Sequence, residues 1–247
     1  MKRILYVGFL LLTSACTMGT PPPAAEPAPT QAPLPTPLPA TSTPTLIPTE
    51  TASPTPAPPP LFFTEEFDAP SPYWEFLQAG GLVPPTPAVE NGFLRIAIPT
   101  ADTWGVGVYN AHAYSNVFVR AKISFSPSGS AGLICRYDGE DGWFEYNLAS
   151  DGTYSVLLGQ WLAEGIAQYQ PIVTDEDSRF FDTGSLTGEI GLFCEDGFLR
   201  LYVNDTLIRN LDVANYGLTQ GGIGVTAASF AEAPMNAVFE WLRVSDK

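Results

Sequence analysis

The sequence predicts an all-β protein whose folded part is a sandwich of two antiparallel sheets, in the manner of a jelly roll. From Leu61 onward, short apolar or alternating runs are separated by turn residues at intervals of roughly 8–12 positions. Asn-Gly and Asp-Gly pairs, which favour tight hairpins, divide several of these runs. No stretch shows a convincing apolar period of about 3.6 residues, and the one helical candidate, residues 161–169, contains Gly165 and lacks caps.

The expected strands follow one another from Leu61 to the C-terminus. Leu61–Phe67 opens the domain, and Asn91-Gly92 is expected to turn a hairpin within Ala88–Ile98. Along Asn116–Phe125 the apolar residues take alternate positions, which predicts one buried and one exposed face. The remaining expected strands are Gly132–Tyr137, Trp143–Leu148, Thr153–Leu158, Glu189–Cys194, Phe198–Asn204, Ile223–Ala228 and Ala237–Val244.

The first 60 residues differ in composition from the rest. Lys2 and Arg3 precede an apolar run from Ile4 to Leu12, which is too short to span a membrane and is typical of a secretory signal. Between Pro21 and Pro60 lie 16 of the 25 prolines, mixed with Thr, Ala and Ser. Such a segment cannot build a core, so we expect a disordered, polyproline-like spacer.

The end of the predicted signal indicates where the protein is located. Leu12-Thr13-Ser14-Ala15-Cys16 resembles the bacterial lipoprotein signal, although Thr13 stands where Leu is commonest. The resemblance implies that residues 1–15 are removed and that Cys16 is lipidated. We therefore expect an extracytoplasmic protein, held at the bacterial cell membrane by lipid alone, with a stalk over residues 16–60 and one domain over 61–247. The alternative is an ordinary signal peptide cleaved near Ala15.

The acidic charge belongs to the domain. The leader contributes +2 and the linker −2, so the net charge of −15 lies on residues 61–247, as 9 basic against 24 acidic residues. A surface of that sign repels phosphate backbones, which argues against a nucleic-acid partner. We expect a monomer.

Two cysteines remain once Cys16 is lipidated. Outside the cytosol, Cys135 and Cys194 can form a disulfide, which would stabilise the fold by roughly 4 kcal/mol in the chain-entropy model. The alternative is a pair of buried free thiols.

An ordered set of short motifs carries a resemblance to a known fold family. The sequence resembles the concanavalin A-like lectin/glucanase superfamily, in particular bacterial laminin-G-like and 3-keto-disaccharide hydrolase-type jelly rolls. This resemblance covers nearly all of residues 61–247, and it implies two antiparallel sheets, one curved into a concave face that often binds carbohydrate. The motifs are Glu65–Asp68, Val89–Ile96, Gly132–Tyr137, Phe144–Leu148, Leu199–Asn204, Gly221–Val225 and Phe239–Val244.

Strand alternation suggests a ligand site on that face. Trp143, Glu145 and Asn147 share one face of their strand, and we expect Arg136 of the preceding strand to join them. A guanidinium, a carboxylate and an amide beside an indole can bind a sugar by hydrogen bonds and ring stacking. The alternative is an exposed Arg136–Glu145 pair without function. Other aromatic residues that could extend the platform are Trp104, Tyr109, Tyr154 and Trp161.

We assign no catalytic residues. His112 is the only histidine, and no Gly-x-Ser-x-Gly elbow is present. The Glu-x-Asp-x-x-Glu strand of the glucanase branch is also absent from the sequence. The resemblance therefore favours carbohydrate or cell-surface glycan binding, and the missing motifs favour binding without catalysis. The alternatives are a glycoside hydrolase or lyase that uses Glu145 as acid or base, and a structural or protein-interaction module.

No cofactor is required by this interpretation, but structural calcium is a candidate. In related jelly rolls an ion ties the first strand to the last. The carboxylates here are Glu66, Asp68 and Glu240, and oxygen ligands of this kind suit calcium.

Overall fold

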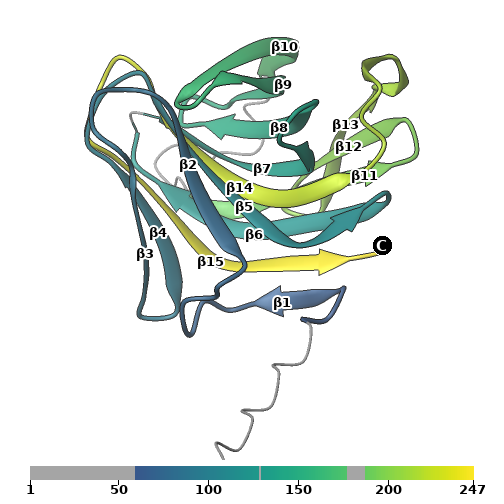
Figure 1. The fold of residues 1–247 in the computed structure, drawn as a ribbon, viewed down its shortest axis with the longest axis horizontal. Coiled ribbons are helices and arrows are strands. Elements are labelled where there is room, and N and C mark those ends of the chain that lie inside the picture. The colour runs from purple at the N-terminus through teal and green to yellow at the C-terminus, as the bar shows by residue number, and fades with distance from the viewer. Residues whose placement is uncertain (1–58, 128, 177–186) are drawn as a thin grey trace, which may run out of the picture. The chain divides into compact units, whose positions relative to one another are not determined.

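The computed structural model describes residues 59–127, 129–176 and 187–247, which form two antiparallel β-sheets (Figure 1). Across these three ranges, no helix has the length and apolar character needed to cross a membrane. The predicted signal peptide, Cys16 and nearly all of the predicted stalk lie outside the described residues.

The first sheet has eight strands in the order β13-β12-β11-β6-β15-β4-β3, and β1 pairs with the far end of β15. Strands β6 and β15 are paired neighbours in this sheet, so the middle and the end of the chain lie side by side. The strands are β1 (Phe63–Glu65), β3 (Thr86–Glu90), β4 (Phe93–Ile98), β6 (Val117–Phe125), β11 (Thr187–Glu195), β12 (Phe198–Val203), β13 (Thr206–Asp212) and β15 (Met235–Ser245).

The second sheet has seven strands in the order β10-β9-β8-β7-β14-β5-β2. The sheet curls far enough for the Gly80 amide, at the end of edge strand β2, to donate to the Gly165 carbonyl in the β9–β10 turn at 3.1 Å. A short 3₁₀ turn, η2 (Ala214–Tyr216), precedes β14. The strands are β2 (Trp74–Gly80), β5 (Thr103–Tyr114), β7 (Gly129–Asp138), β8 (Gly142–Ala149), β9 (Thr153–Ala163), β10 (Ile166–Glu176) and β14 (Gly221–Ser229).

The two sheets pack face to face over one main core of apolar side chains, which confirms the predicted all-β jelly-roll sandwich. Strand β6 shows how the sequence builds it. Its residues alternate strictly between buried and half-buried, with Val117, Val119, Ala121, Ile123 and Phe125 on the core side. The predicted alternation is therefore confirmed.

The predicted hairpin at Asn91-Gly92 is also confirmed, and it joins β3 to β4. Asn91 has φ 56° and Gly92 has φ 76°, so both central residues adopt the left-handed conformation that a type I′ turn requires. Asn and Gly tolerate this conformation better than other residues.

Four strands were not expected from the sequence: β2, β5, β10 and β13. Most of β5 is buried on both faces, so it lacks the alternation that marks a half-exposed strand. Strand β10 is largely exposed and carries Pro171 in its interior, which weakens its strand pattern. The helical candidate 161–169 is the turn region of the β9–β10 hairpin, with Gly165 at φ +72°.

The predicted disulfide is present. Cys135 of β7 is bonded to Cys194 of β11, with a Cα–Cα distance of 6.7 Å. Both residues are completely buried, and the bond joins the seven-stranded sheet to the eight-stranded one.

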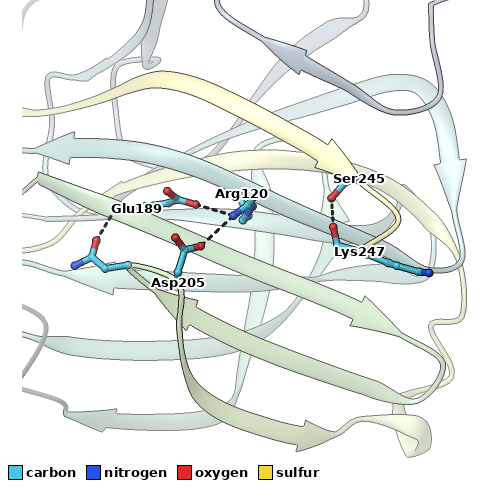
Figure 2. A network of polar contacts seen from close by, with 6 residues as sticks. Arg120, Glu189, Asp205, Ser245 and Lys247 are labelled. Atoms are coloured by element: carbon cyan, nitrogen blue, oxygen red, sulfur yellow. Dashed lines mark hydrogen bonds and ion pairs between the residues drawn. The ribbon is translucent and has the colours of Figure 1, made fainter.

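Ion pairs line the outer surface of the eight-stranded sheet. Figure 2 shows Arg120 of β6 between Glu189 of β11, at 3.3 Å, and Asp205 of the β12–β13 turn, at 3.0 Å. Beyond them, the Ser245 hydroxyl donates to the Lys247 carbonyl at 2.7 Å. The side chains of Arg120 and Glu189 are 22% and 24% exposed, whereas that of Asp205 is 72% exposed. Partly solvent-exposed pairs of this kind contribute modestly to stability.

Candidate ligand-binding face of the seven-stranded sheet

The face of the seven-stranded sheet that points away from the main core is called here the cleft face. On β8 it carries Trp143, Glu145 and Asn147, whose side chains contact one another. The intervening residues Phe144, Tyr146 and Leu148 belong to the main core. This division follows from the two-residue period of a strand, as the sequence predicts.

Glu145 is a buried carboxylate at the centre of this face, with no exposed surface. Its Oε2 accepts a hydrogen bond from Trp143 Nε1 at 3.0 Å. Its Oε1 accepts from Asn147 Nδ2 at 2.7 Å and from the Thr226 hydroxyl of β14 at 3.1 Å. Burial raises the pKa of Glu145 above its usual value, and the three donors oppose that rise.

The cleft face was expected to be open, but it is closed at Trp143 and Glu145, which are both fully buried. The β9–β10 hairpin covers them, because the rings of Trp161 and Tyr169 lie 5.2 and 5.9 Å from that of Trp143. Gly159 of β9 makes room for the indole, since a Cβ there would lie 2.3 Å from the Trp143 ring.

Arg136 does not join the other three residues. It has φ +53° at a bulge in the β7–β8 pairing, where the strand alternation breaks. Its guanidinium donates to the Leu218 carbonyl at 2.8 Å and to the Asp196 carbonyl, and burial lowers its pKa. The bulge therefore turns Arg136 toward loops beside the eight-stranded sheet and leaves Tyr137 on the cleft face.

A first cavity, of about 290 Å³, opens on the cleft face beside Asn147. Trp104 of β5 and Phe230 form an aromatic wall, with their rings edge to face at 6.3 Å. Asn147 is 4% exposed, and its Oδ1 has no hydrogen-bond partner in the protein. The polar residues that line the cavity are Ser130, Asn147, Asp151, Thr153, Ser155 and Thr174.

A second cavity, of about 550 Å³, lies between β2 and the tip of the β9–β10 hairpin. The aromatic residues of its lining are Phe76, Tyr137 and Trp161, and Trp161 Nε1 donates to the Tyr137 hydroxyl at 3.0 Å. A series of ring contacts connects the two cavities, from Trp104 through Tyr169, Trp143 and Trp161.

Structure comparison decides the fold. The chain superposes on a Bacillus licheniformis beta-glucanase with a TM-score of 0.53 and 12% identity, over 75% of this chain and 98% of that one. A Bacteroides ovatus GH16 protein, solved with a G4G4G3G product, gives a TM-score of 0.53 at 8% identity, over 74% of this chain and 99% of that one. The fold is a concanavalin A-like jelly roll. A Bacillus subtilis protein of unknown function with a galectin-like fold gives a TM-score of 0.52 at 12% identity, over 74% of this chain and 94% of that one.

Sequence comparison adds nothing to this result, since no family model and no curated protein matches the chain. At identities this low, the structural likeness establishes the concanavalin A-like fold alone.

The calcium candidates do not come together in this concanavalin A-like domain. Glu240 pairs with Lys122 of β6 at 2.6 Å, while Glu66 and Asp68 are exposed after β1. Within the described ranges, no group of three His, Cys, Asp or Glu side chains could hold a metal ion. Bound calcium stays a prediction from the sequence, without a cluster of ligands to support it.

His112 lies on β5, where its Nε2 is 3.0 Å from the Pro59 carbonyl. The neighbouring Tyr114 hydroxyl donates to the Leu61 carbonyl at 2.8 Å. Both side chains therefore fasten the segment before β1 against β5, which is a structural role.

Sequence reasoning found Asn147 and named Trp104, but missed the rest of the first cavity. Asp151, Thr153, Ser155 and Thr174 come from β9, β10 and the turn before β9, and Phe230 follows β14. Alternation along Thr153–Leu158 would have placed Thr153 and Ser155 on the face opposite the buried Tyr154 and Val156. Phe230 carries no such signal.

Proposed function

We propose that the protein binds carbohydrate in the first cavity of the cleft face and does not cleave it. The observation that carries the proposal is the Asn147 amide. Glu145 holds its nitrogen at 2.7 Å, while its buried oxygen lacks a protein donor beside an aromatic wall. A buried acceptor without a donor is costly, and a sugar hydroxyl can supply that donor once ligand binding uncovers the oxygen, which has almost no accessible surface in this structure.

The rest of the cavity suits a neutral, hydroxyl-rich ligand. The half-buried Trp104 offers an indole surface for the C–H face of a sugar ring. Hydroxyls of Ser130, Thr153, Ser155 and Thr174 can both donate and accept hydrogen bonds. No basic side chain lines this cavity among the described residues, which disfavours an anionic ligand.

The same geometry argues against hydrolysis. Glycoside hydrolysis commonly needs two carboxylates that flank the scissile bond. The cleft face of β8 carries one carboxylate, and both oxygens of Glu145 accept hydrogen bonds inside the protein. A fully buried group with its oxygens occupied is suited to positioning Asn147.

One observation favours a second candidate, a glycoside hydrolase. Burial raises the pKa of Glu145, whereas the Thr153 amide, at 2.9 Å, lowers the pKa of Asp151 in the first cavity. Two carboxyls with opposite shifts are the pattern of an acid and its ionised partner. For Glu145 to act as the acid, the side chains that cover it would have to move.

Retention on a panel of polysaccharides and oligosaccharides tests the proposal, with release of reducing ends measured in the same samples. We expect retention without release. Trp104→Ala should abolish retention, because it removes the stacking surface. Trp241→Ala is the matched control, because it removes an indole from the outer face of the eight-stranded sheet, where Arg243 lies 5.4 Å above the ring.

Each other outcome selects an alternative. Release of reducing ends that Glu145→Gln abolishes would establish the hydrolase. Failure to bind any glycan would leave a structural or protein-interaction module. Equal retention by Trp104→Ala and wild type would place the glycan site outside the first cavity.

For the remainder of the chain, we propose that Cys16 carries lipid and that residues 16–60 hold the domain away from the bacterial membrane. The support is the order of signal, cysteine and proline-rich segment in the sequence. Several acyl chains on one residue give stable anchoring, whereas a single chain does not. A glycan-binding domain in this position would attach the cell to surface polysaccharide.

A further inference from the structure

We infer that the second cavity binds a small organic cation of the quaternary ammonium class, independently of any carbohydrate in the first cavity. The two cavities share no lining residue. The second is also the larger, at about 550 Å³, and falls within the usual range of small-molecule sites.

Aromatic side chains provide the first part of the argument. Tyr137 and Trp161 line the cavity, and neither residue is fully buried. The hydrogen bond of 3.0 Å from Trp161 Nε1 to the Tyr137 hydroxyl fixes the two rings relative to each other. Trp161 is further packed against Trp143 at 5.2 Å. Preorganised indole and phenol faces attract cations through their quadrupoles.

Charge provides the second part. Glu75 of β2 and Glu164 of the β9–β10 turn lie on the cavity wall, and no lining residue in the described part of the chain is basic. Asn110 Nδ2 donates to Glu75 Oε2 at 2.7 Å and holds that carboxylate in place. The pKa of Tyr137 is raised, chiefly by burial, and the charges of Glu75 and Asp138 add to the rise. Glu75 and Asp138 therefore lie close enough to Tyr137 to add negative charge to its surroundings.

The combination selects the ligand class. A neutral sugar would gain no charge–charge attraction from the two exposed carboxylates, and an anion would be repelled by them. Leu77 and Pro84 give the cavity apolar walls, which suit methyl groups better than a strongly hydrated metal ion. A quaternary ammonium group suits the carboxylates, the apolar walls and the aromatic residues of this cavity, because it carries a positive charge, presents a methyl surface and stacks on aromatic faces.

Ligand-observed NMR tests the inference on the whole protein, with choline as the probe and no glycan present. We expect saturation transfer to the choline methyl groups that titrates to a plateau. The uncharged isostere 3,3-dimethylbutan-1-ol, which has the same shape, should give no saturable signal. Phosphocholine should bind more weakly than choline, because Glu75 and Glu164 repel its phosphate.

Variants locate the site. Glu75→Gln and Glu164→Gln should each weaken choline binding about two- to fivefold, as expected for the loss of one solvent-accessible charge. Glu176→Gln removes the same charge at the opposite end of β10 and should leave binding unchanged. Trp161→Leu should weaken binding more than Trp161→Phe, which keeps a ring and guards against a simple folding defect.

Three results would overturn the inference: no saturable choline signal, equal binding of the neutral isostere, or tighter binding of phosphocholine than of choline. The inference would also be overturned if Glu75→Gln and Glu164→Gln bound choline as tightly as Glu176→Gln does. Because glycan is absent from the experiment, a negative polysaccharide screen has no bearing on its outcome.

Discussion

Burying the Glu145 carboxylate costs desolvation energy, which its three hydrogen-bond donors partly offset. Without its partners the charge would be unstable in an apolar cluster. With them, the carboxylate fixes the tilt of the Trp143 indole and the orientation of the Asn147 amide at once. The Asn147 amide is therefore held in one orientation, with its oxygen next to Gly132 of β7.

The stability of the fold should depend on the protonation of Glu145. Because burial raises its folded-state pKa, the folded protein binds this proton more tightly than the unfolded chain does. The resulting stabilisation is complete below the unfolded pKa of about 4.3 and is lost as the pH rises through the folded pKa. Glu145→Gln removes this contribution, so the advantage of wild type over Glu145→Gln in free energy of unfolding should shrink between about pH 4 and pH 7.

Urea unfolding at both pH values measures this difference. Glu176→Gln is the control, because it changes an exposed glutamate at the end of β10 and should follow wild type at each pH. A difference between wild type and Glu145→Gln that stays constant with pH would contradict the raised pKa.

At the scale of elements, the pairing of β8 with β9 depends on a residue without a side chain. Trp143 lies opposite Gly159 in the register, and its ring occupies the space above that glycine. The indole thus fits into the sheet surface, and the β9–β10 hairpin can cover it. This contact closes the middle of the cleft face and leaves the cavities on either side of it.

Gly159→Ala should therefore destabilise the fold by about 1–3 kcal/mol, the usual cost of overpacking a filled site. The new Cβ would lie 2.3 Å from the Trp143 ring, so the ring or the strand must shift. Gly139→Ala, where a Cβ meets no atom within 4 Å, should stay within about 0.5 kcal/mol of wild type. Equal unfolding midpoints for the two variants in urea would show that Trp143 yields without cost.

The elements also show what the sequence can and cannot predict. Strand β6 and the Asn91-Gly92 hairpin were predictable because each depends on a local signal, alternation in one case and left-handed turn residues in the other. The bulge at Arg136 was not, because arginine gives no sign of a positive φ, and one missed bulge moves a side chain to the other face.

The candidate site divides in the same way. Alternation correctly placed Trp143, Glu145 and Asn147 on one face, but it could not show that the β9–β10 hairpin covers two of them. Covering depends on the curl of the whole sheet, which brings Gly165 to Gly80, and no local pattern encodes that contact.

At the scale of the molecule, one disulfide joins the two sheets covalently. Cys135 and Cys194 are 59 residues apart in sequence and join the two sheets. In the chain-entropy model, a loop of that size is worth about 4 kcal/mol, chiefly through restriction of the unfolded chain. Reduction, or the pair Cys135→Ala and Cys194→Ala, should lower the free energy of unfolding by about 2–5 kcal/mol.

Urea titration with and without reductant measures that loss. Reductant should have no further effect on the double variant, which serves as the control. Thiol titration of the unfolded, unreduced protein should detect neither cysteine, and an unfolding midpoint insensitive to reductant would contradict the stabilising role.

The proposed lipid anchor concerns the whole chain, and it would decide where the cleft face can act. If lipid on Cys16 holds the protein, Cys16→Ser should move it from the membrane fraction to the soluble fraction, because a chain without acyl groups has no stable hold on a bilayer. Thr17→Ser alters the adjacent residue and should leave the protein in the membrane fraction. Immunoblots of fractionated cells, with the mass of the mature N-terminal peptide, measure both effects. A Cys16→Ser protein that stays with the membrane after cleavage near Ala15 would place the anchor elsewhere, whereas release would support lipid on Cys16 as the anchor.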